Sequence, residues 1–251
     1  MTTEKIWELR LSPEQIRRQR EKVRAALIEA SANISGGKIT RLSERDLALL
    51  FEHYDAVFLH GFFKANIKGK ISFSLSRRMS QSAGKVISPG NLAHLPPEQE
   101  RYELRLSADF FFNYGALERE KLVNGIPSRD ALEALQLVFE HELCHLLELH
   151  LFKHSSCRGS RFKQMAANLF GHTQSYHHLP TVREIAGEKF GLSVGDPVRF
   201  TAEGHCYEGV ISRITKRATV MVRDEKGDYR DQQGHRYSKW YVPLAMLEKV
   251  K

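Results

Sequence analysis

The segment from Ser128 to Phe152 limits the fold more than any other part of the chain, because it combines helical apolar spacing with the pattern His-Glu-x-x-His. On a helix of about 100° per residue, His141 and His145 lie one turn apart on nearly the same line, so both imidazoles can reach one ion. Glu142 is turned by about 100° from His141. It falls inside an apolar arc, with the histidines at its margin. The arc consists of Leu132, Leu135, Val138, Phe139, Leu143, Leu146 and Leu149.

A carboxylate inside an apolar arc is costly unless it has a partner, such as a cation or a water activated by a metal. In zinc hydrolases, a glutamate at this place in the pattern acts as general base on a water that the ion activates. The sequence therefore predicts a metal site with His141 and His145 as ligands and Glu142 as the base. The competing interpretation is a chance coincidence of surface histidines, since the chain has 12 of them.

Two further helices are predicted from their starting residues. Ser12, with Pro13 and Gln15 after it, has the pattern of a capping box and opens a helix that runs to about residue 31. Ser43 and Asp46 open a second helix.

Alternating apolar residues predict strands in the next part of the chain. Residues 71–75 and 86–87, with a turn around Gly84, predict a β-hairpin, and residues 102–106 predict another strand. A helix is expected from Gly159 to about Phe170.

The last 60 residues differ in character from the rest. After a linker at 181–191, residues 192–251 contain short alternating runs between glycine turns, which predict a small five-stranded SH3-like barrel that binds a partner. Its aromatic residues could line a groove, although a place in the barrel core is favoured. They are Tyr207, Tyr237, Trp240 and Tyr241.

Composition supports a globular protein that is neither secreted nor membrane-bound. Hydrophobic residues make up 41% and charged residues 27% of the chain, and no apolar run approaches the roughly 20 residues that span a membrane. The start lacks a signal peptide, and the three cysteines form no CxxC pair, so a cytoplasmic location with reduced thiols is expected. The net charge of +8 is compatible with nucleic acid as a partner and equally with an ordinary basic surface.

Four segments together resemble the SprT-like family of HExxH zinc metalloproteases, which includes Spartan. They are "LSRRMSQSAGKV" (75–86), "RYELRLSADFFF" (101–112), "FEHELCHLLELH" (139–150) and "RGSRFKQMAANLFGHTQSYHHL" (158–179). The resemblance covers roughly residues 43–180 and implies an α+β, zincin-like domain there, preceded by a helical extension at 1–42. It also implies one zinc ion and endopeptidase activity on protein substrates at nucleic acid.

The third zinc ligand departs from the family pattern. The family uses the histidine of an HGxxF motif, and here the matching segment "RGSRF" has Arg158 in that position. Arginine cannot donate a lone pair to a metal. Cys157 and His154 are the two candidates to replace the histidine. Alternatively, Arg158 pairs with Glu142 or Glu148 and replaces the ion, which would make the protein an inactive adaptor that binds nucleic acid or protein.

Two further expectations concern partners. The resemblance implies that the strand at Leu104–Asp109 is an edge strand that pairs with the substrate backbone. Basic residues around the hairpin and the site are candidate phosphate contacts, with ordinary exposed charges as the alternative. These residues are Arg77, Arg78, Lys85, Arg161 and Lys163.

Overall fold

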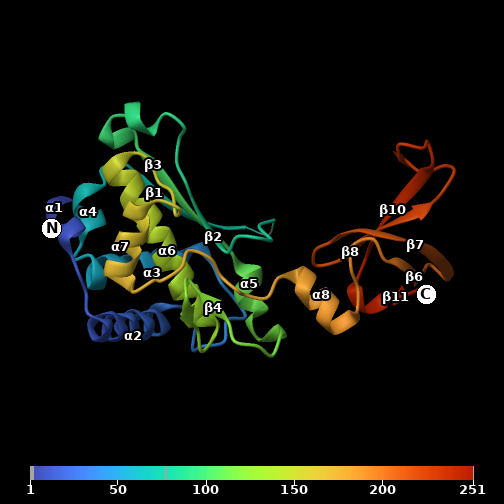
Figure 1. Ribbon diagram of the computed structural model, residues 1–251, viewed down its shortest axis with the longest axis horizontal. Coiled ribbons are helices and arrows are strands. Elements are labelled where there is room, and N and C mark those ends of the chain that lie inside the picture. The colour runs from blue at the N-terminus through green and yellow to red at the C-terminus, as the bar shows by residue number, and fades with distance from the viewer. Residues whose placement is uncertain (1–2, 77, 251) are drawn as a thin grey trace. The chain divides into compact units, whose positions relative to one another are not determined.

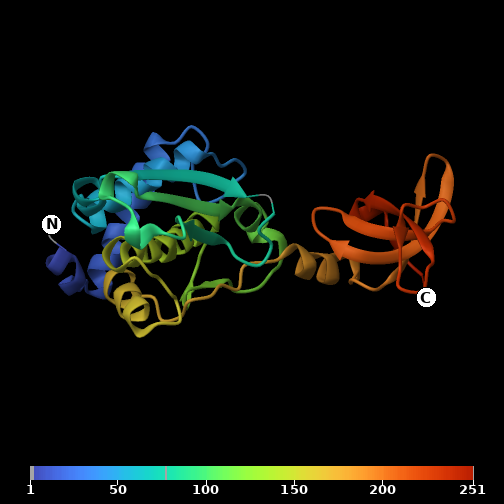
Figure 2. The ribbon, with the colours of Figure 1, turned by 90° about the horizontal axis from the view of Figure 1, so that it is seen from above.

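The chain divides into two units, residues 1–179 and 180–251, which are described separately below. The structure is a computed structural model that describes residues 3–76 and 78–250 (Figures 1 and 2). Both units combine helices with antiparallel strand pairing, and the chain therefore belongs to the α+β class that the sequence predicted.

The first unit begins with four helices: α1 (Thr3–Glu8), α2 (Pro13–Ala30), α3 (Glu44–Phe58) and α4 (Phe62–Asn66). The predicted capping boxes of α2 and α3 are confirmed. The side chains of Ser12 and Ser43 accept from the third amide of each helix, and their own backbone amides donate to the side chains of Gln15 and Asp46. Both helices contribute to the core with the apolar face that the spacing predicts. Val23, Leu27, Leu47 and Leu50 are fully buried.

The sheet of the first unit has the order β1-β3-β2, with β1 at Lys70–Ser76, β2 at Gly84–Ile87 and β3 at Arg101–Ser107. The predicted hairpin between 71–75 and 86–87 is wrong, because β1 and β2 pair with opposite sides of β3, in parallel and antiparallel directions respectively. The expectation of an edge strand at Leu104–Asp109 is wrong for the same reason: β3 is central, and Ala108 already begins helix α5. The edge strands are β1 and β2.

Short elements connect the sheet to the long helix. They are the 3-10 helices Leu92–His94, Pro97–Gln99 and Tyr114–Ala116, helix α5 (Ala108–Phe112), and the strands β4 (Leu122–Val123) and β5 (Ile126–Pro127). Asn124 and Gly125 form the tight turn between β4 and β5, both with positive φ, as an Asn-Gly hairpin requires. The Asn124 side chain donates to the carbonyl of Leu137 at 2.7 Å and so attaches this hairpin to the long helix.

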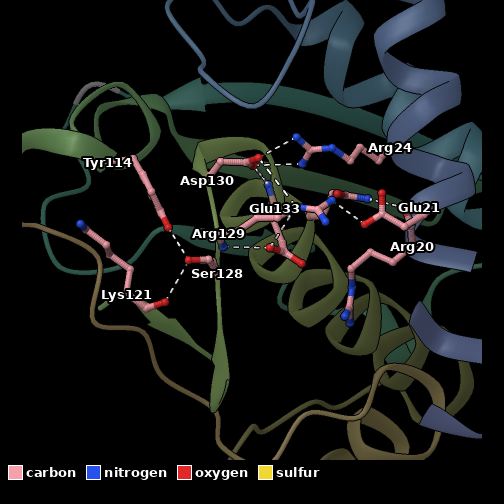
Figure 3. A network of polar contacts seen from close by, with 10 residues as sticks. Arg20, Glu21, Arg24, Tyr114, Lys121, Ser128, Arg129, Asp130 and Glu133 are labelled. Carbon is pink, nitrogen blue, oxygen red and sulfur yellow. Dashed lines mark hydrogen bonds and ion pairs between the residues drawn. The ribbon is translucent and has the colours of Figure 1, made fainter. Parts of the chain in front are cut away.

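The long helix α6 (Ala131–Phe152) packs against β2 and is followed by α7 (Ser160–Phe170), which lies beside it in Figures 1 and 2. It begins two to three residues later than predicted, because Asp130 rather than Ser128 is the cap and accepts from the amide of Glu133. The Arg24 guanidinium on α2 faces the Asp130 carboxylate in Figure 3, with nitrogen–oxygen distances of 2.6 and 3.0 Å. This pair fixes the start of α6 against α2.

A second ion pair, in which Glu140 is fully buried and Arg20 nearly so, joins the same two helices near the middle of α6. The Glu140 carboxylate receives two hydrogen bonds of 2.8 Å from Arg20, one of 2.7 Å from the hydroxyl of Tyr54, and lies 3.0 Å from Nε2 of His172. Glu140 directly precedes His141, so this network sets the position of the helix face that carries the histidines.

The second unit contains helix α8 (Val182–Phe190) and a six-stranded antiparallel sheet with the order β11-β6-β7-β8-β10-β9. The strands are β6 (Pro197–Ala202), β7 (His205–Ile214), β8 (Ala218–Arg223), β9 (Tyr229–Arg230), β10 (Arg236–Val242) and β11 (Glu248–Lys249), with a 3-10 helix at Leu244–Met246 before the last. The segment at 181–191 is the one for which the sequence predicted a linker. It forms a capped helix whose Ala186 is buried in the core of this unit.

The aromatic residues of the second unit divide between core and surface. Tyr207 and Trp240 are half-buried, lie 4.6 Å apart between ring centroids and pack against the core with Phe200. Tyr241 is 63% exposed. Tyr207 and Trp240 thus follow the core interpretation. Within the described part of the chain, no helix has the length and apolar character needed to cross a membrane.

Candidate metal centre

Three side chains from two segments meet at one point in the first unit. His141 and His145 come from α6 and Cys157 from the loop that connects α6 to α7, and their ligand atoms lie within 4.8 Å of one another. All three are half-buried. In tetrahedral zinc sites with Zn–N near 2.0–2.1 Å and Zn–S near 2.3 Å, ligand atoms are roughly 3.3–3.6 Å apart. The three groups therefore lie close to the arrangement that such an ion requires.

The structure separates the alternatives for the third position. Cys157 lies beside the two histidines, whereas His154 is exposed and outside the cluster. Arg158 is also exposed, and Oε2 of Glu142 has no hydrogen-bond partner among the described residues, so no Arg158–Glu142 pair takes the place of an ion. Glu148 is paired instead with Arg161, at 2.9 Å from Nε.

Glu142 is buried beside this cluster and faces β2. Its side chain lines the same cavity as the ligand residues, it is 3% exposed, and the backbone amide of Val86 donates to its carboxyl group. The second oxygen, Oε2, is buried and has no hydrogen-bond partner among the residues described. This oxygen is therefore available to a water or a cation, the kind of partner that the sequence argument expected for Glu142.

Burial changes the proton affinity of all three groups from the helix. It raises the pKa of Glu142 to about 8, against a smaller opposing effect of the Val86 amide. It lowers the pKa of His141 to about 3 and that of His145 to about 4, because the charged imidazolium is disfavoured away from water. At neutral pH both histidines are therefore neutral, which is the form that can donate a lone pair to a metal.

Phe162 holds the two imidazoles from the side of α7. It is fully buried, with ring centroids 4.8 Å from His141 and 4.5 Å from His145. The two histidine rings are themselves 4.9 Å apart and nearly perpendicular. Phe162 is the last residue of the "RGSRF" segment, so this segment contributes to the site even though its arginine does not.

A series of hydrogen bonds links His145 to Ser155 in the loop after α6 and, through Ser155, to Glu148. Nδ1 of His145 lies 2.7 Å from the Ser155 hydroxyl, which donates to Oε2 of Glu148 at 2.6 Å. The same oxygen accepts from the amide of Ser156 at 3.0 Å, and Arg161 pairs with the other oxygen of Glu148.

The cluster opens into a cavity of about 440 Å³ between α6, β2 and the segment that follows α7. Residues from five places in the chain line it besides the ligands and Glu142: residues 82–88, 123–124, α6, the loop after α6, and 175–177. They are Ser82, Ala83, Gly84, Lys85, Val86, Ser88, Val123, Asn124, Val138, Leu149, Ser155, Ser175, Tyr176 and His177. This volume lies in the range of ligand-binding pockets and is far larger than a single ion requires.

The predicted basic contacts have different outcomes. Arg77 lies outside the described residues. Arg78 and Lys163 are exposed, and Lys85 is exposed at the rim of the cavity. Arg161 is ion-paired with the buried Glu148 and lies 3.9 Å from the ring centroid of Phe152. Its charge is therefore neutralised within the unit by Glu148.

The sequence analysis did not predict that Ser155 contacts His145, that Glu148 binds the loop after α6, or that Gly84 lines the cavity beside Glu142. No pattern marks Ser155 in the sequence. Glu148 stands one turn after His145, where its side chain meets the loop rather than the cluster. Gly84 carried a signal as a glycine in an alternating segment, a position that often marks a close backbone approach.

Comparison of this chain with protein-family models, with curated proteins and with solved structures gave no significant match in any of the three searches.

Proposed function

We propose that the first unit is a SprT-like, zinc-dependent endopeptidase with a His₂Cys ligand set. The observation that carries the proposal is the convergence of His141, His145 and Cys157 beside the buried Glu142 at the wall of an open cavity. The donor set fits the ion: two neutral imidazoles and one thiol match sets known for catalytic zinc, with a fourth position left for the reacting group. Zinc in such a site supplies Lewis-acid activation of water and of a peptide carbonyl.

The residues of the chain supply the remaining functions. Glu142, which lines the same cavity as the ligand residues, would accept a proton from the attacking water and pass it to the leaving amine. In the zinc-free chain burial keeps Glu142 protonated at neutral pH, and a dication beside it would favour the carboxylate that a base requires. His141, His145 and Cys157 would hold the ion at one point of the cavity wall and so fix where the reaction takes place.

Strand β2 is the proposed docking edge for the substrate backbone. Ser107 donates its amide to the carbonyl of Ala83 at 2.9 Å, and in an antiparallel ladder the paired residues alternate, so the backbone groups of Gly84 and Val86 turn away from β3. The Val86 amide already donates to Glu142 and the Gly84 carbonyl accepts from the Ser82 hydroxyl, so the groups offered to a substrate are the Gly84 amide and the Val86 carbonyl. An extended peptide can add to this edge and would then pass beside Glu142.

A role at nucleic acid is a secondary part of the proposal. It is supported by Arg78 and Lys85, which are exposed on either side of the start of β2. For the second unit we propose an SH3-like barrel that recruits a partner. The support is the antiparallel pairing of its strands, of which the described residues form six rather than the expected five.

The experiment that tests the activity is hydrolysis of an unfolded protein substrate by the full chain, with and without added DNA. Wild-type protein is expected to cleave the substrate and to lose this activity on chelation, and Glu142→Gln is expected to be inactive at equal zinc content. Cleavage that survives in Glu142→Gln, or an inactive wild type with a full complement of zinc, would contradict the proposal.

A further inference from the structure

The hydrogen at Ser155 can be assigned from its neighbours. Each oxygen of Glu148 faces a donor that cannot act as acceptor: Oε1 faces the Arg161 guanidinium and Oε2 faces the Ser156 amide. Glu148 is therefore a carboxylate with no hydrogen to give, and the hydroxyl of Ser155, 2.6 Å from Oε2, must donate to it.

A serine hydroxyl has one hydrogen, so Ser155 accepts in its other contact. That contact is the 2.7 Å approach of Nδ1 of His145, which must then carry a hydrogen. In a neutral imidazole the other nitrogen, Nε2, keeps its lone pair.

We propose that Ser155 and Glu148 are positioning residues of the metal centre, which fix His145 in the tautomer that presents Nε2 and hold the loop that carries Cys157. The inference rests on the zinc site of the proposed function. Hydrogen bonds from the second nitrogen of a ligand histidine orient the ring and increase its basicity, and losing such a partner typically costs 10–100-fold in metal affinity.

The Glu148 carboxylate both orients His145 and holds the loop that carries Cys157. Glu148 is 1% exposed, accepts the Ser155 hydroxyl that orients His145, and accepts the amide of Ser156, which directly precedes Cys157. Arg161 closes the outer side of Glu148 and stacks on Phe152, so the carboxylate keeps a neutralising partner inside the unit. The orientation of one ligand and the position of another thus depend on the same side chain.

The test compares variants of the full chain with Ser155→Ala as the diagnostic change. Ser156→Ala is the matched control, since it makes the same change one residue later, where the backbone amide rather than the hydroxyl meets Glu148. Ser155→Thr keeps the hydroxyl and is expected to rescue. Long-range ¹H–¹⁵N correlation spectra of histidine-labelled, zinc-free protein report the tautomer of His145, and competition with a chelator reports zinc affinity.

The wild-type spectrum is expected to show His145 with its hydrogen on Nδ1, and Ser155→Ala to show a mixture with the Nε2–H form. Zinc affinity should fall about 10–100-fold in Ser155→Ala and remain unchanged in Ser156→Ala. A wild-type His145 with its hydrogen on Nε2 would overturn the inference without the need for any variant, and so would an unchanged tautomer in Ser155→Ala. If the tautomer follows Ser155 but no variant binds zinc, the zinc proposal fails while the tautomer assignment is supported.

Discussion

Gly84 on β2 approaches the carboxyl group of Glu142 on α6 so closely that a β-carbon at position 84 would lie 2.4 Å from Oε1 and 2.8 Å from the carboxyl carbon. No side chain can be added there unless Glu142 moves. The edge strand and the proposed general base are therefore in direct contact, and the strand sets where the carboxylate lies.

Replacing Gly84 by alanine should displace Glu142 while leaving the ligand residues in place. Because displacements of about 1 Å can cost on the order of 100-fold in rate, we expect kcat/KM to fall by at least that factor with unchanged zinc content. Gly90→Ala is the control, since a β-carbon at position 90 meets nothing within 4 Å. Activity of Gly84→Ala close to wild type would show that the carboxylate position is not critical.

The raised pKa of Glu142 predicts a pH-dependent stability of the zinc-free protein. The unfolded chain loses this proton near 4.5 and the folded chain near 8, so the folded state holds the extra proton between these values. The contribution of Glu142 to the free energy of unfolding is complete below about 4.5 and is lost as the pH rises to about 8, by at most about 1.4 kcal/mol per pH unit.

Comparison with Glu142→Gln isolates this effect from the histidines, whose lowered pKa values give the opposite slope below 6.5. Urea unfolding of both zinc-free proteins should show the variant gaining stability relative to wild type from pH 5 to pH 8. The exposed Glu118→Gln serves as control. A constant difference between Glu142→Gln and wild type across this range would mean that Glu142 is not buried as the structure has it.

The buried pair of Arg20 and Glu140 predicts a large loss of stability on removal of one partner. Arg20→Met leaves the carboxylate of Glu140, which is 0% exposed, without its cation, and such changes typically cost about 3–5 kcal/mol. Arg17→Met, on the exposed face of the same helix, should change the free energy of unfolding by less than about 0.5 kcal/mol. Equal effects of the two substitutions in denaturant unfolding would contradict the assigned role of Arg20.

The starts of α2 and α3 and the burial of Glu142 could be predicted from sequence because they depend on neighbouring residues, whereas the cap of α6 is Asp130 rather than the predicted Ser128. Ser12 and Ser43 each lie three residues from their capping partner, and Glu142 lies one or a few turns from the leucines that surround it. The strand order depended on residues far apart instead. Residues 71–75 and 86–87 alternate as paired strands do, but both pair with β3 rather than with each other.

The choice between Cys157 and His154 also lay beyond the sequence. Both stand within four residues of Arg158, and either could be brought to the histidines by a loop of suitable shape. The shape is set by Glu148, which binds Ser155 and the amide of Ser156 and so determines which following side chain faces inward. Nothing in the spacing of these residues indicates that contact.

The zinc content of the purified full chain, prepared without chelators, tests the central claim most directly. We predict about one zinc ion per chain in wild type, in Glu142→Gln and in Cys206→Ser, which alters an exposed cysteine of the second unit, and a clear loss of zinc in Cys157→Ser. Wild-type protein without zinc, or a Cys157→Ser variant that retains it with wild-type affinity, would contradict the account.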